Sequence, residues 1–457
     1  MASDWLDVQL QDVVSKLGDG LHGTPKYSED GEYYFINGNN LENGKIVFKD
    51  TTKRVNKEQY LKYKKTLNDR TLLVSINGTI GNIAYYNSEK VVLGKSACYF
   101  NLKDDIDKSY VRYVLSGHYF QSYINTFATG TTIKNISLKT MREFSFKLPY
   151  LPEQKAIAHF LGTLDNKIEL NRQMNQTLES MAQTLFKSWF VDFDPVIDNA
   201  LAAGNPIPDA LKAKAGQRAD QLKAATQSGT LPTANRKLFP SEFTFTEELG
   251  WIPKGWEVKK LCELIDLTGG GTPKTSVEEY WSGEIPWFSV VDAPSQSDLY
   301  VLDTEKHVTQ LGVDKSSTKI LNFGTTIISA RGTVGKCAMV SRPTAMNQSC
   351  YGINGKEGIA DIYTYYSVLI NISDLQQKAH GSVFNTITTN TFSTIHLPFG
   401  GEKLTLAFDA NVESFFKKIL LNGIQAQNLA KLRDTLLPKL LSGELRIAEA
   451  AALVEGV

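Results

Sequence analysis

The sequence predicts an α+β protein in which two globular α/β-type domains, in a pseudo-two-fold arrangement, are separated by two long antiparallel coiled-coil helices. An internal repeat, β-rich runs inside each copy of it and a helical heptad pattern after each copy predict this fold. The two copies keep an offset of 251 residues at both of their ends, where Trp5 recurs as Trp256 and Ile157 recurs as Phe408. The chain is therefore expected to contain two equivalent structural frames.

The middle of each copy does not keep this offset. The GTPK motif at residues 23–26 recurs at 271–274, an offset of 248, and NGTIG at 77–81 corresponds to RGTVG at 331–335, an offset of 254. Chance similarity would not slip by several residues and then return to the original offset. We therefore predict that each frame holds a variable body, and that one task is performed twice on two different targets.

Composition places the chain among soluble globular proteins, with 457 residues, 42% hydrophobic and 21% charged. The formal net charge is zero, so binding to nucleic acid would require charge that is locally segregated. Residues 40–70 hold nine Lys or Arg against four acids, whereas the matching residues 292–324 hold three Lys against five acids. The two bodies are expected to present different surfaces.

Cysteine usage and the amino-terminal sequence favour an intracellular protein. The four cysteines fit no zinc-binding spacing, and Cys98 and Cys350 occupy matching apolar positions, so we expect reduced core residues. The start of the chain lacks a basic region followed by an apolar core, and no apolar run reaches about 18 residues. We expect neither secretion nor a membrane span, and we predict a cytoplasmic location.

The first domain is predicted over residues 1–150. Its strand-like segments are 72–86, 91–100 and 144–149, where β-branched and aromatic residues alternate with Gly and Asn turns. A helix is predicted over 108–127. The second domain, predicted over 251–400, repeats this order with a helical patch at 363–378.

Each domain is followed by a long helix, predicted over 151–194 and 401–446, with a tail at 447–457. Pro152 and Glu153 are suited to a first helical turn. Apolar residues then recur in alternating steps of four and three, which is typical of a coiled-coil seam. From the helical rise per residue, the first long helix is expected to span about 55–60 Å. The seam positions are Ile157, Leu161, Leu164, Ile168, Asn171, Asn175, Leu178, Ala182, Leu185 and Trp189, and then Phe408, Val412, Phe415, Ile419, Asn422, Ala426, Leu429, Arg433, Leu436 and Leu440.

Asn171 and Asn422 occupy the same position of the two seams. A buried Asn fixes register and partner, so we predict that the two helices pair with each other through these residues and through Leu164, Ile168, Phe415 and Ile419. The pairing is expected to be antiparallel because a whole domain separates the helices. The alternative is that each helix packs only on its own domain.

Residues 195–250 have no counterpart in the second copy. Their Ala, Gly and Pro content predicts a connector with one short helix at 209–227 and no chemistry.

Catalytic motifs are missing from the chain. GKS at 94–96 lacks the upstream glycine of a phosphate loop, and GGG at 269–271 is not followed by the helix and acidic residue of a dinucleotide site. The Asp/Asn-Pro-Pro-aromatic segment of amino-group methylation does not occur, and the six histidines form no metal-ligand cluster. We predict a protein that is not an enzyme, holds no metal and carries no cofactor of its own.

Two duplicated glycine loops are the first candidate binding elements. Residues 75–81 and 329–335 each place two glycines three apart between strands, so that backbone amides could approach a ligand closely. The first loop carries Asn77 and Asn82 where the second carries Arg331 and Lys336. Arg reads guanine and Asn reads adenine, so this difference fits two base-reading loops. The alternative is a tight β-turn with incidental polar residues.

Two further segments offer hydroxyls, amides and Lys of the kind that hold phosphates. The segment 130–135 contains Thr131 and Lys134, with Lys139 following it, and the segment 381–386 contains Asn385. The two GTPK motifs add Lys26 and Lys274. Solvated loops would have the same composition.

The chain resembles the DNA specificity subunits of type I restriction-modification enzymes. The similarity extends over nearly the whole chain: the GTPK and glycine loops, LPYLPEQKAIAHFLGTLDNKIELNRQMNQTLESMAQTLFKSWFVDFDP after the first domain, LGWIPKGWEV before the second, and LRDTLLPKLLSGELR at 432–446. One departure is GGEK at 400–403 in place of the Pro-Glu-Gln-Lys of 152–155, which leaves the start of the second long helix open.

The resemblance implies two target-recognition domains that each read one half of a split double-stranded DNA target, held apart by the paired helices. It also implies two bound methyltransferase subunits, which bring S-adenosylmethionine and adenine-N6 chemistry, and restriction or motor subunits, which bring ATP and Mg. The chain itself would be a non-catalytic subunit. The alternatives are a structural adaptor without DNA contact, and a self-contained nuclease or methyltransferase that would need the missing motifs.

Overall fold

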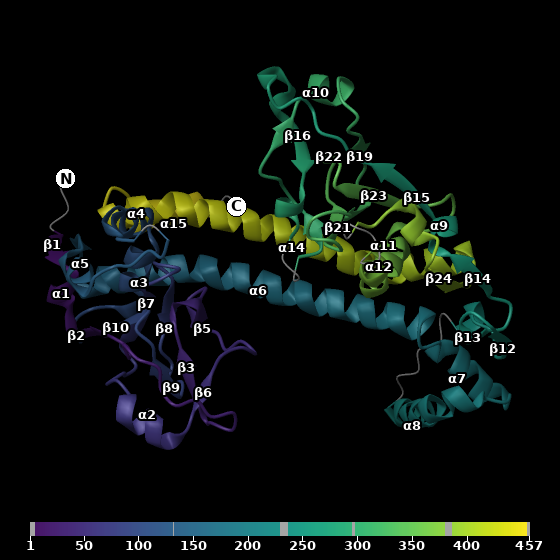
Figure 1. Ribbon diagram of the computed structural model, residues 1–457, viewed down its shortest axis with the longest axis horizontal. Helices are drawn as coiled ribbons and strands as arrows, with labels where there is room; N and C mark the ends of the chain where they lie inside the picture. The colour runs from purple at the N-terminus through teal and green to yellow at the C-terminus, as the bar shows by residue number, and fades with distance from the viewer. Residues whose placement is uncertain (1–4, 131, 229–235, 295–297, 380–385, 455–457) are drawn as a thin grey trace. The chain divides into compact units, whose positions relative to one another are not determined.

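The computed structural model describes residues 5–130, 132–228, 236–294, 298–379 and 386–454. The chain divides into two compact units, one formed by residues 1–168 with 428–457 and the other by residues 169–427. Each unit contains one sheet-rich body and a stretch of both long helices (Figure 1). The predicted mixture of helix and sheet in two bodies is confirmed.

The first body is built on a four-stranded antiparallel sheet in the order β2–β10–β7–β8. Its two central strands are buried along their whole length, which explains their continuous apolar sequences. A second sheet, β6–β3–β9, and two strand pairs, β4–β5 and β1–β11, complete the body. The strands are β1 Leu6–Gln9, β2 Val14–Asp19, β3 Tyr33–Ile36, β4 Leu41–Glu42, β5 Lys45–Ile46, β6 Arg54–Val55, β7 Thr71–Ser75, β8 Ile83–Tyr85, β9 Val91–Leu93, β10 Ala97–Leu102 and β11 Ser145–Leu148.

The helix predicted over 108–127 is two helices. Asp107 caps the first through its side chain, which accepts the amide of Tyr110, and Gly117 ends it. Gly117 has extended backbone and donates its own amide to Tyr113 and Val114, so a new helix starts at His118. The helices of this body are α1 Leu10–Val13, η1 Gly38–Asn40, α2 Lys57–Tyr63, α3 Lys108–Ser116, α4 His118–Phe127 and α5 Leu138–Glu143.

The second body repeats this topology. Its main sheet has the order β15–β23–β20–β21, as in the first body, and β17 extends it by pairing parallel to β21. A sheet β18–β16–β22–β19 and the pairs β14–β24 and β12–β13 complete it. The strands are β12 Phe243–Thr246, β13 Gly250–Pro253, β14 Glu257–Lys260, β15 Ile265–Gly269, β16 Trp281–Phe288, β17 Tyr300–Val301, β18 His307–Val308, β19 Ile320–Leu321, β20 Thr326–Ser329, β21 Cys337–Val340, β22 Thr344–Met346, β23 Cys350–Gly355 and β24 His396–Phe399.

The helical patch at 363–378 is also divided, as it is in the first body. It consists of α11 and α12, which correspond in order to α3 and α4. The helices of the second body are α9 Leu261–Leu264, η4 Glu278–Tyr280, η5 Val290–Asp292, α10 Gln310–Asp314, α11 Asp361–Leu369, α12 Ile372–Ala379 and α13 Thr389–Phe392.

The connector is more ordered than its composition predicts. It contains α7 Asp194–Ala203, η2 Asp209–Leu211, α8 Lys212–Ser228 and η3 Arg236–Leu238, as well as β12. Asp198 on α7 is buried and accepts hydrogen bonds from the guanidinium of Arg218 on α8, which fastens the two helices together.

Two long helices, α6 Leu151–Phe190 and α14 Glu402–Ser442, follow the bodies, and a short helix, α15 Ile447–Val454, follows α14. In the first unit Asp165 contacts Arg433, and in the second Asn175 contacts Ile419, so that residue numbers rise along one helix as they fall along the other. The predicted antiparallel pairing is confirmed. No helix among the described residues is long and apolar enough to cross a membrane.

The helix pair also packs on the bodies, so the alternative that the helices pack on their own domains is partly correct. Ile157 and Leu161 of α6 share one core with Leu436 and Leu440 of α14 and with side chains of the first body. Phe415, a predicted seam residue, is only partly buried, and Phe416 is buried beside Tyr365 and Tyr366 instead. The seam shifts because α14 must face a body as well as α6.

An asparagine layer lies on the buried side of the pair in the second unit. Asn171 donates to the carbonyl oxygen of Asn422 (3.4 Å) and to Gln425 Oε1 (3.0 Å). Asn175 donates to the carbonyl oxygen of Ile419 (3.0 Å) and accepts a hydrogen bond from Asn422 Nδ2 (2.9 Å). These bonds satisfy the three buried amides in one register only.

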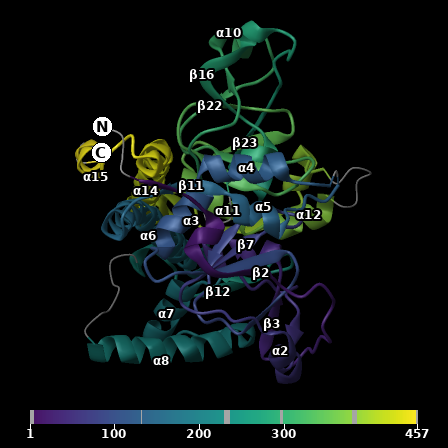
Figure 2. The same cartoon turned by 90° about the vertical axis from the view of Figure 1, so that its left-hand side faces the viewer.

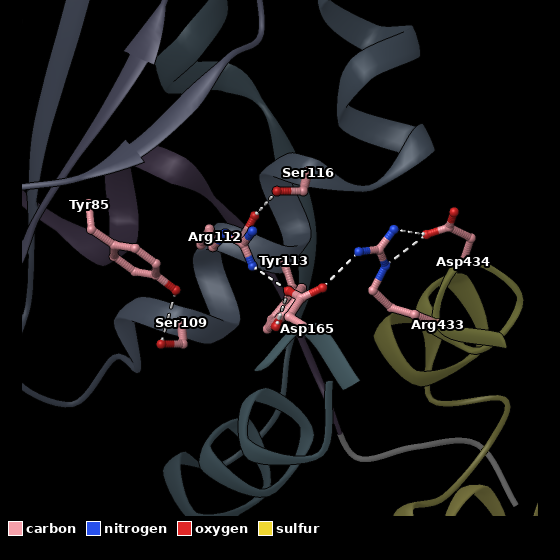
Figure 3. Close-up of polar contacts among 8 residues, drawn as sticks. All are labelled: Tyr85, Ser109, Arg112, Tyr113, Ser116, Asp165, Arg433 and Asp434. Atoms are coloured by element: carbon pink, nitrogen blue, oxygen red, sulfur yellow. Dashed lines mark hydrogen bonds and ion pairs between the residues drawn. The ribbon is translucent and has the colours of Figure 1, made fainter. Parts of the chain in front are cut away.

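A charged network joins the pair to the first body (Figure 3). Asp165 of α6 accepts hydrogen bonds from Arg112 (3.0 Å) and Tyr113 (2.7 Å) of α3 and from Arg433 (2.7 Å) of α14. Burial alone would raise the pKa of the Asp165 carboxyl, but the bonds from Arg433, Tyr113 and Arg112 outweigh burial and hold its pKa below the ordinary value. The carboxylate therefore stabilises the contact in its charged form.

Replacing Asn422 by Leu is expected to lower the free energy of unfolding by about 1–3 kcal/mol, because the Oδ1 atom of the buried Asn175 then loses its hydrogen-bond donor. Urea denaturation measures the change. Gln176→Leu on the exposed side of α6 is the matched control and is expected to change stability by less than about 0.5 kcal/mol. Equal stability of the two variants would contradict the register role of the layer.

Asp165→Asn is expected to destabilise the chain by about 2 kcal/mol at pH 7, because two arginines lose a charged acceptor. The pKa of Asp165 is lowered in the folded state, so its contribution is present above the unfolded-state value of about 4 and is lost as pH falls below it. The difference between wild type and variant should therefore shrink between pH 5 and pH 3 in urea titrations. Asp434→Asn, at a more exposed partner of Arg433, should show a smaller effect, and a pH-independent difference for Asp165→Asn would refute the assignment.

Candidate functional site

The two glycine loops have the same backbone geometry. The amide of Ser75 donates to the carbonyl of Asn82 and the amide of Ser329 to that of Lys336, both at 2.8 Å. The hydroxyl of each serine accepts the amide of the same residue, again at 2.8 Å in both loops. The loops are therefore equivalent elements, although their sequences differ in the polar positions.

The second glycine of each loop allows the loop to lie against a helix. Gly81 has a φ of 87°, and a Cβ atom on it would come within 2.3 Å of Gln121 Oε1 on α4. Gly335 has a φ of 89°, and a Cβ atom there would come within 2.6 Å of Gln376 Nε2 on α12. Each glutamine in turn donates to a loop carbonyl, of Gly81 and of Val334. Glycine is required here by close packing and by positive φ.

Amides that were expected to reach a ligand are already used within the protein. Gly81 donates to the carbonyl of Ser75, Asn82 to the hydroxyl of Ser75, and Gly78 to the carbonyl of Lys134. Gly335 and Lys336 repeat the first two bonds. The expectation of free amides at these positions was wrong, because the tight turn needs them for its own closure. The loops can offer side chains to a partner, as the turn alternative foresaw.

The side chains that differ between the loops lie at the surface to different degrees. Asn77 donates to Asn135 Oδ1 (3.1 Å), and Asn82 is partly buried. Arg331 and Lys336 are exposed, and their side chains form no hydrogen bond or ion pair with any described residue. The second loop thus presents two free cations where the first presents neutral amides.

The residues that directly follow the two predicted phosphate-binding segments are hydrogen-bonded to the glycine loops. The amide of Ile136 donates to the carbonyl of Ile76 (2.8 Å), and the amide of Ile387 donates to that of Ala330 (3.0 Å). Lys134 donates to Asn125 Oδ1 (2.8 Å), while Lys139 is exposed and 3.7 Å from a carboxylate oxygen of Glu143. Two further predicted residues, Thr131 and Asn385, lie outside the described residues.

The two GTPK motifs lie near equivalent strands of the two bodies, but their individual residues do not occupy equivalent positions. The amide of Leu21 donates to the carbonyl of Leu93, and the amide of Gly271 donates to that of Met346, in both cases next to the parallel strand pair of the body. The lysines follow these anchors at different separations. Lys26 and Lys274 are both exposed. The backbone amide of Lys26 donates to Gln59 on α2 (3.0 Å), which places this lysine beside that helix.

The first body also has an aromatic surface that was not predicted from the sequence. Phe48 stacks on Tyr34 with ring centres 4.0 Å apart, and Arg54 lies over the same tyrosine, 5.0 Å from its centre. The signal available in the sequence was the excess of cations at residues 40–70, which was noted only as a difference in surface.

The potential metal-ligating side chains are dispersed over the part of the chain that the structure describes. Its residues include no group of three or more His, Cys, Asp or Glu that could hold a metal ion. The four cysteines are free thiols, and burial raises the pKa of Cys98 and Cys350, which keeps both protonated. All four cysteines were predicted to be core residues; Cys98 and Cys350 are buried, whereas Cys262 and Cys337 are only partly buried.

Comparison with known proteins identifies the family. Residues 2–180 and 253–399 match the family described as the type I restriction modification DNA specificity domain. The chain is 31% identical over 333 residues to the type I restriction enzyme HindI specificity subunit of Haemophilus influenzae, a match that covers 69% of this chain and 72% of the relative. It is 30% identical over 184 residues to the MjaIX specificity subunit of Methanocaldococcus jannaschii, covering 40% of this chain and 42% of the relative.

The fold has a solved counterpart in the S subunit of a type I restriction-modification system from M. genitalium. The two structures superpose with a TM-score of 0.56 over 96% of each chain, at 17% sequence identity. The two matched segments contain both duplicated bodies and most of α6. The chain therefore belongs to the family of type I restriction-modification DNA specificity subunits.

Proposed function

We propose that this specificity subunit directs a type I restriction-modification complex to a bipartite double-stranded DNA target, with each body reading one half. The duplicated glycine loops carry this proposal. They share their hydrogen bonds and their glycine conformations, yet Asn77 and Asn82 of one correspond to Arg331 and Lys336 of the other. A constant scaffold with different donors at equivalent positions is what two readers of unlike base sequences require. A structural adaptor without DNA readout would need no such difference.

The paired helices set the spacing between the halves and dock the methyltransferase subunits. Leu170 of α6 is 50% exposed, and its repeat equivalent on α14, Leu421, is 62% exposed. Met174 and Met181 continue the apolar stripe on α6, and Ile424 continues it on α14. Duplicated apolar residues on the outer side of both helices fit two copies of one partner. A partner bound at these positions would also explain why the helix pair exposes large apolar side chains to solvent.

The chain supplies recognition and no catalysis. Its partners are the DNA, two methyltransferase subunits and the restriction or motor subunits, and S-adenosylmethionine, ATP and Mg belong to those partners. The missing catalytic motifs and the engaged backbone amides of the glycine loops support this division. The internally paired amides leave these loops poorly suited to hold a nucleotide phosphate by themselves.

Mapping of methylated adenines in cells that express the chain with its cognate methyltransferase is expected to show an interrupted target of two short halves. Arg331→Ala is expected to relax one base position in one half only, by about 1–3 kcal/mol or 10- to 100-fold in discrimination. Lys315→Ala, at an exposed lysine of the same body, is the control and should leave the target unchanged. A single undivided target would refute the two-reader proposal.

Leu170→Glu and Leu421→Glu are each expected to remove one of the two methyltransferase subunits, because a carboxylate replaces a side chain that an apolar interface would bury. Analytical ultracentrifugation of the assembled complex measures its stoichiometry. Each single variant should retain one methyltransferase, and the double variant should retain none. Gln176→Glu is the exposed control on α6. Full assembly of the double variant would exclude this docking surface.

A further inference from the structure

Helix α2 and strand β3 lie at the end of the first body opposite the helices α3 and α4 (Figures 1 and 2), and the surface at that end is basic. It is formed by β3, β6, α2 and the GTPK segment, and we call it the basic face. Its cations are Lys26, Lys53, Arg54, Lys57, Lys62 and Lys64, all of them exposed.

A rigid aromatic platform holds part of this surface in place. Strand pairing sets Arg54 opposite Tyr34, and Arg54 Nη2 donates to the tyrosine hydroxyl (3.1 Å). Phe48 stacks on the same ring at an interplanar angle of 21° and remains 40% exposed. The guanidinium is therefore positioned before any partner binds, which lowers the entropy lost on binding.

Helix α2 presents the lysines on a fixed base. Asn56 caps its amino terminus by accepting the amide of Gln59, and Tyr60 stacks on Tyr33 of β3 with ring centres 4.0 Å apart. The apolar side of α2 packs against a small core containing Phe35 and Val92. The lysines of α2 consequently lie on the outer side of a well-packed element.

Exposed acids lie in the same stretch of chain, at Glu29, Asp30, Glu32, Asp50 and Glu58, so the positive charge of the basic face depends on cations that are not paired with them. Lys53, Lys57, Lys62 and Lys64 form no ion pair with a described residue, whereas Lys49 nearby is paired with Glu42. Unpaired lysines and an arginine on one rigid surface produce a local positive potential although the whole chain has zero net charge. A polyanion is the partner that matches this chemistry.

The counterpart in the second body has the opposite character. Its strands β16 and β18, with η4 and α10, occupy the place of β3, β6 and α2 in the topology. The exposed charges there include six acids, Glu278, Glu279, Glu284, Asp303, Glu305 and Asp314, against four lysines, Lys274, Lys306, Lys315 and Lys319. Asp303 is paired with Arg342 and His307, which uses a further cation of that body.

We infer that the basic face binds the phosphate backbone of duplex DNA. The first body then supplies most of the DNA affinity that depends on salt and not on sequence, and the acidic counterpart in the second body supplies none of it. This inference rests on the proposed function and assigns the backbone contact to one of the two target-reading bodies. Lysine and arginine contacts to phosphates release condensed counterions and add affinity without reading sequence. The glycine loop of the first body lies against α4, so base reading and the phosphate contact occupy different places in that body.

The experiment measures binding of the complete complex with its methyltransferase subunits to two duplexes, with and without the mapped target, over a range of salt concentrations. The triple variant Lys53→Ala, Lys57→Ala, Lys62→Ala is expected to make the slope of log affinity against log salt shallower by about 2.7, from about 0.9 per phosphate contact. Affinity at 0.1 M salt should fall by about 100-fold or more for both duplexes, and their affinity ratio should not change. Circular dichroism checks that the variant is folded.

The matched control is Lys306→Ala, Lys315→Ala, Lys319→Ala in the second body, which removes the same number of exposed lysines and is expected to leave the slope unchanged. An unaltered slope in the first variant, or an equal loss in both variants, would overturn the inference. A variant that keeps its DNA affinity and loses a protein subunit would also overturn it and would assign the basic face to an acidic protein. Equal wild-type affinity for the two duplexes contradicts the proposed function instead, and the slopes still decide the inference.

Discussion

The rest of the structure depends on the antiparallel pairing of α6 and α14, because each long helix must pack on the other helix and on a body at once. The buried amides of Asn171, Asn175 and Asn422 satisfy one another and the facing backbone in one register. A slip by one turn would leave them buried without partners, at a cost of about 1–3 kcal/mol for each. Apolar seam residues alone would tolerate several registers, so the asparagine layer restricts the two helices to one register.

Equivalent positions of this frame hold opposite chemistry in the two units. In the first unit Asp165 and Arg433 are joined to α3 by charged hydrogen bonds, whereas the residues at the corresponding repeat positions, Phe416 and Ala182, belong to an aromatic core with Tyr365. The repeat therefore conserves geometry while the contacts that realise it differ. The charged network beside one body and the aromatic cluster beside the other also distinguish the two ends of each helix. Arg433 at the position of Phe416 would leave a guanidinium without an acceptor.

Local patterns in the sequence predicted much of this fold, and contacts between distant segments account for what they missed. The 251-residue repeat, the heptads and the strands of 72–86 depend on periodicity and on turn residues, which sequence displays directly. The burial of Phe416 in place of Phe415 and the use of the loop amides depend on residues far away along the chain, such as Lys134 for Gly78. In the candidate site, the residue types could be predicted, but their hydrogen-bond partners could not. Asn77 donates a hydrogen bond to Asn135, which neither sequence segment shows alone.

A net charge of zero is compatible with DNA recognition when charge is segregated on a rigid surface. Zero net charge spread evenly would give little attraction beyond the screening distance of about 8–10 Å. The first body instead concentrates cations around stacked tyrosines and Phe48, while the matching region of the second body concentrates acids. Variable bodies on a constant frame can thus differ in how strongly they hold the backbone as well as in which bases they read. Sequence specificity is a difference of affinities, so a backbone contact confined to one body lets the base-reading loops of both halves determine which DNA is bound without making non-target DNA bind tightly.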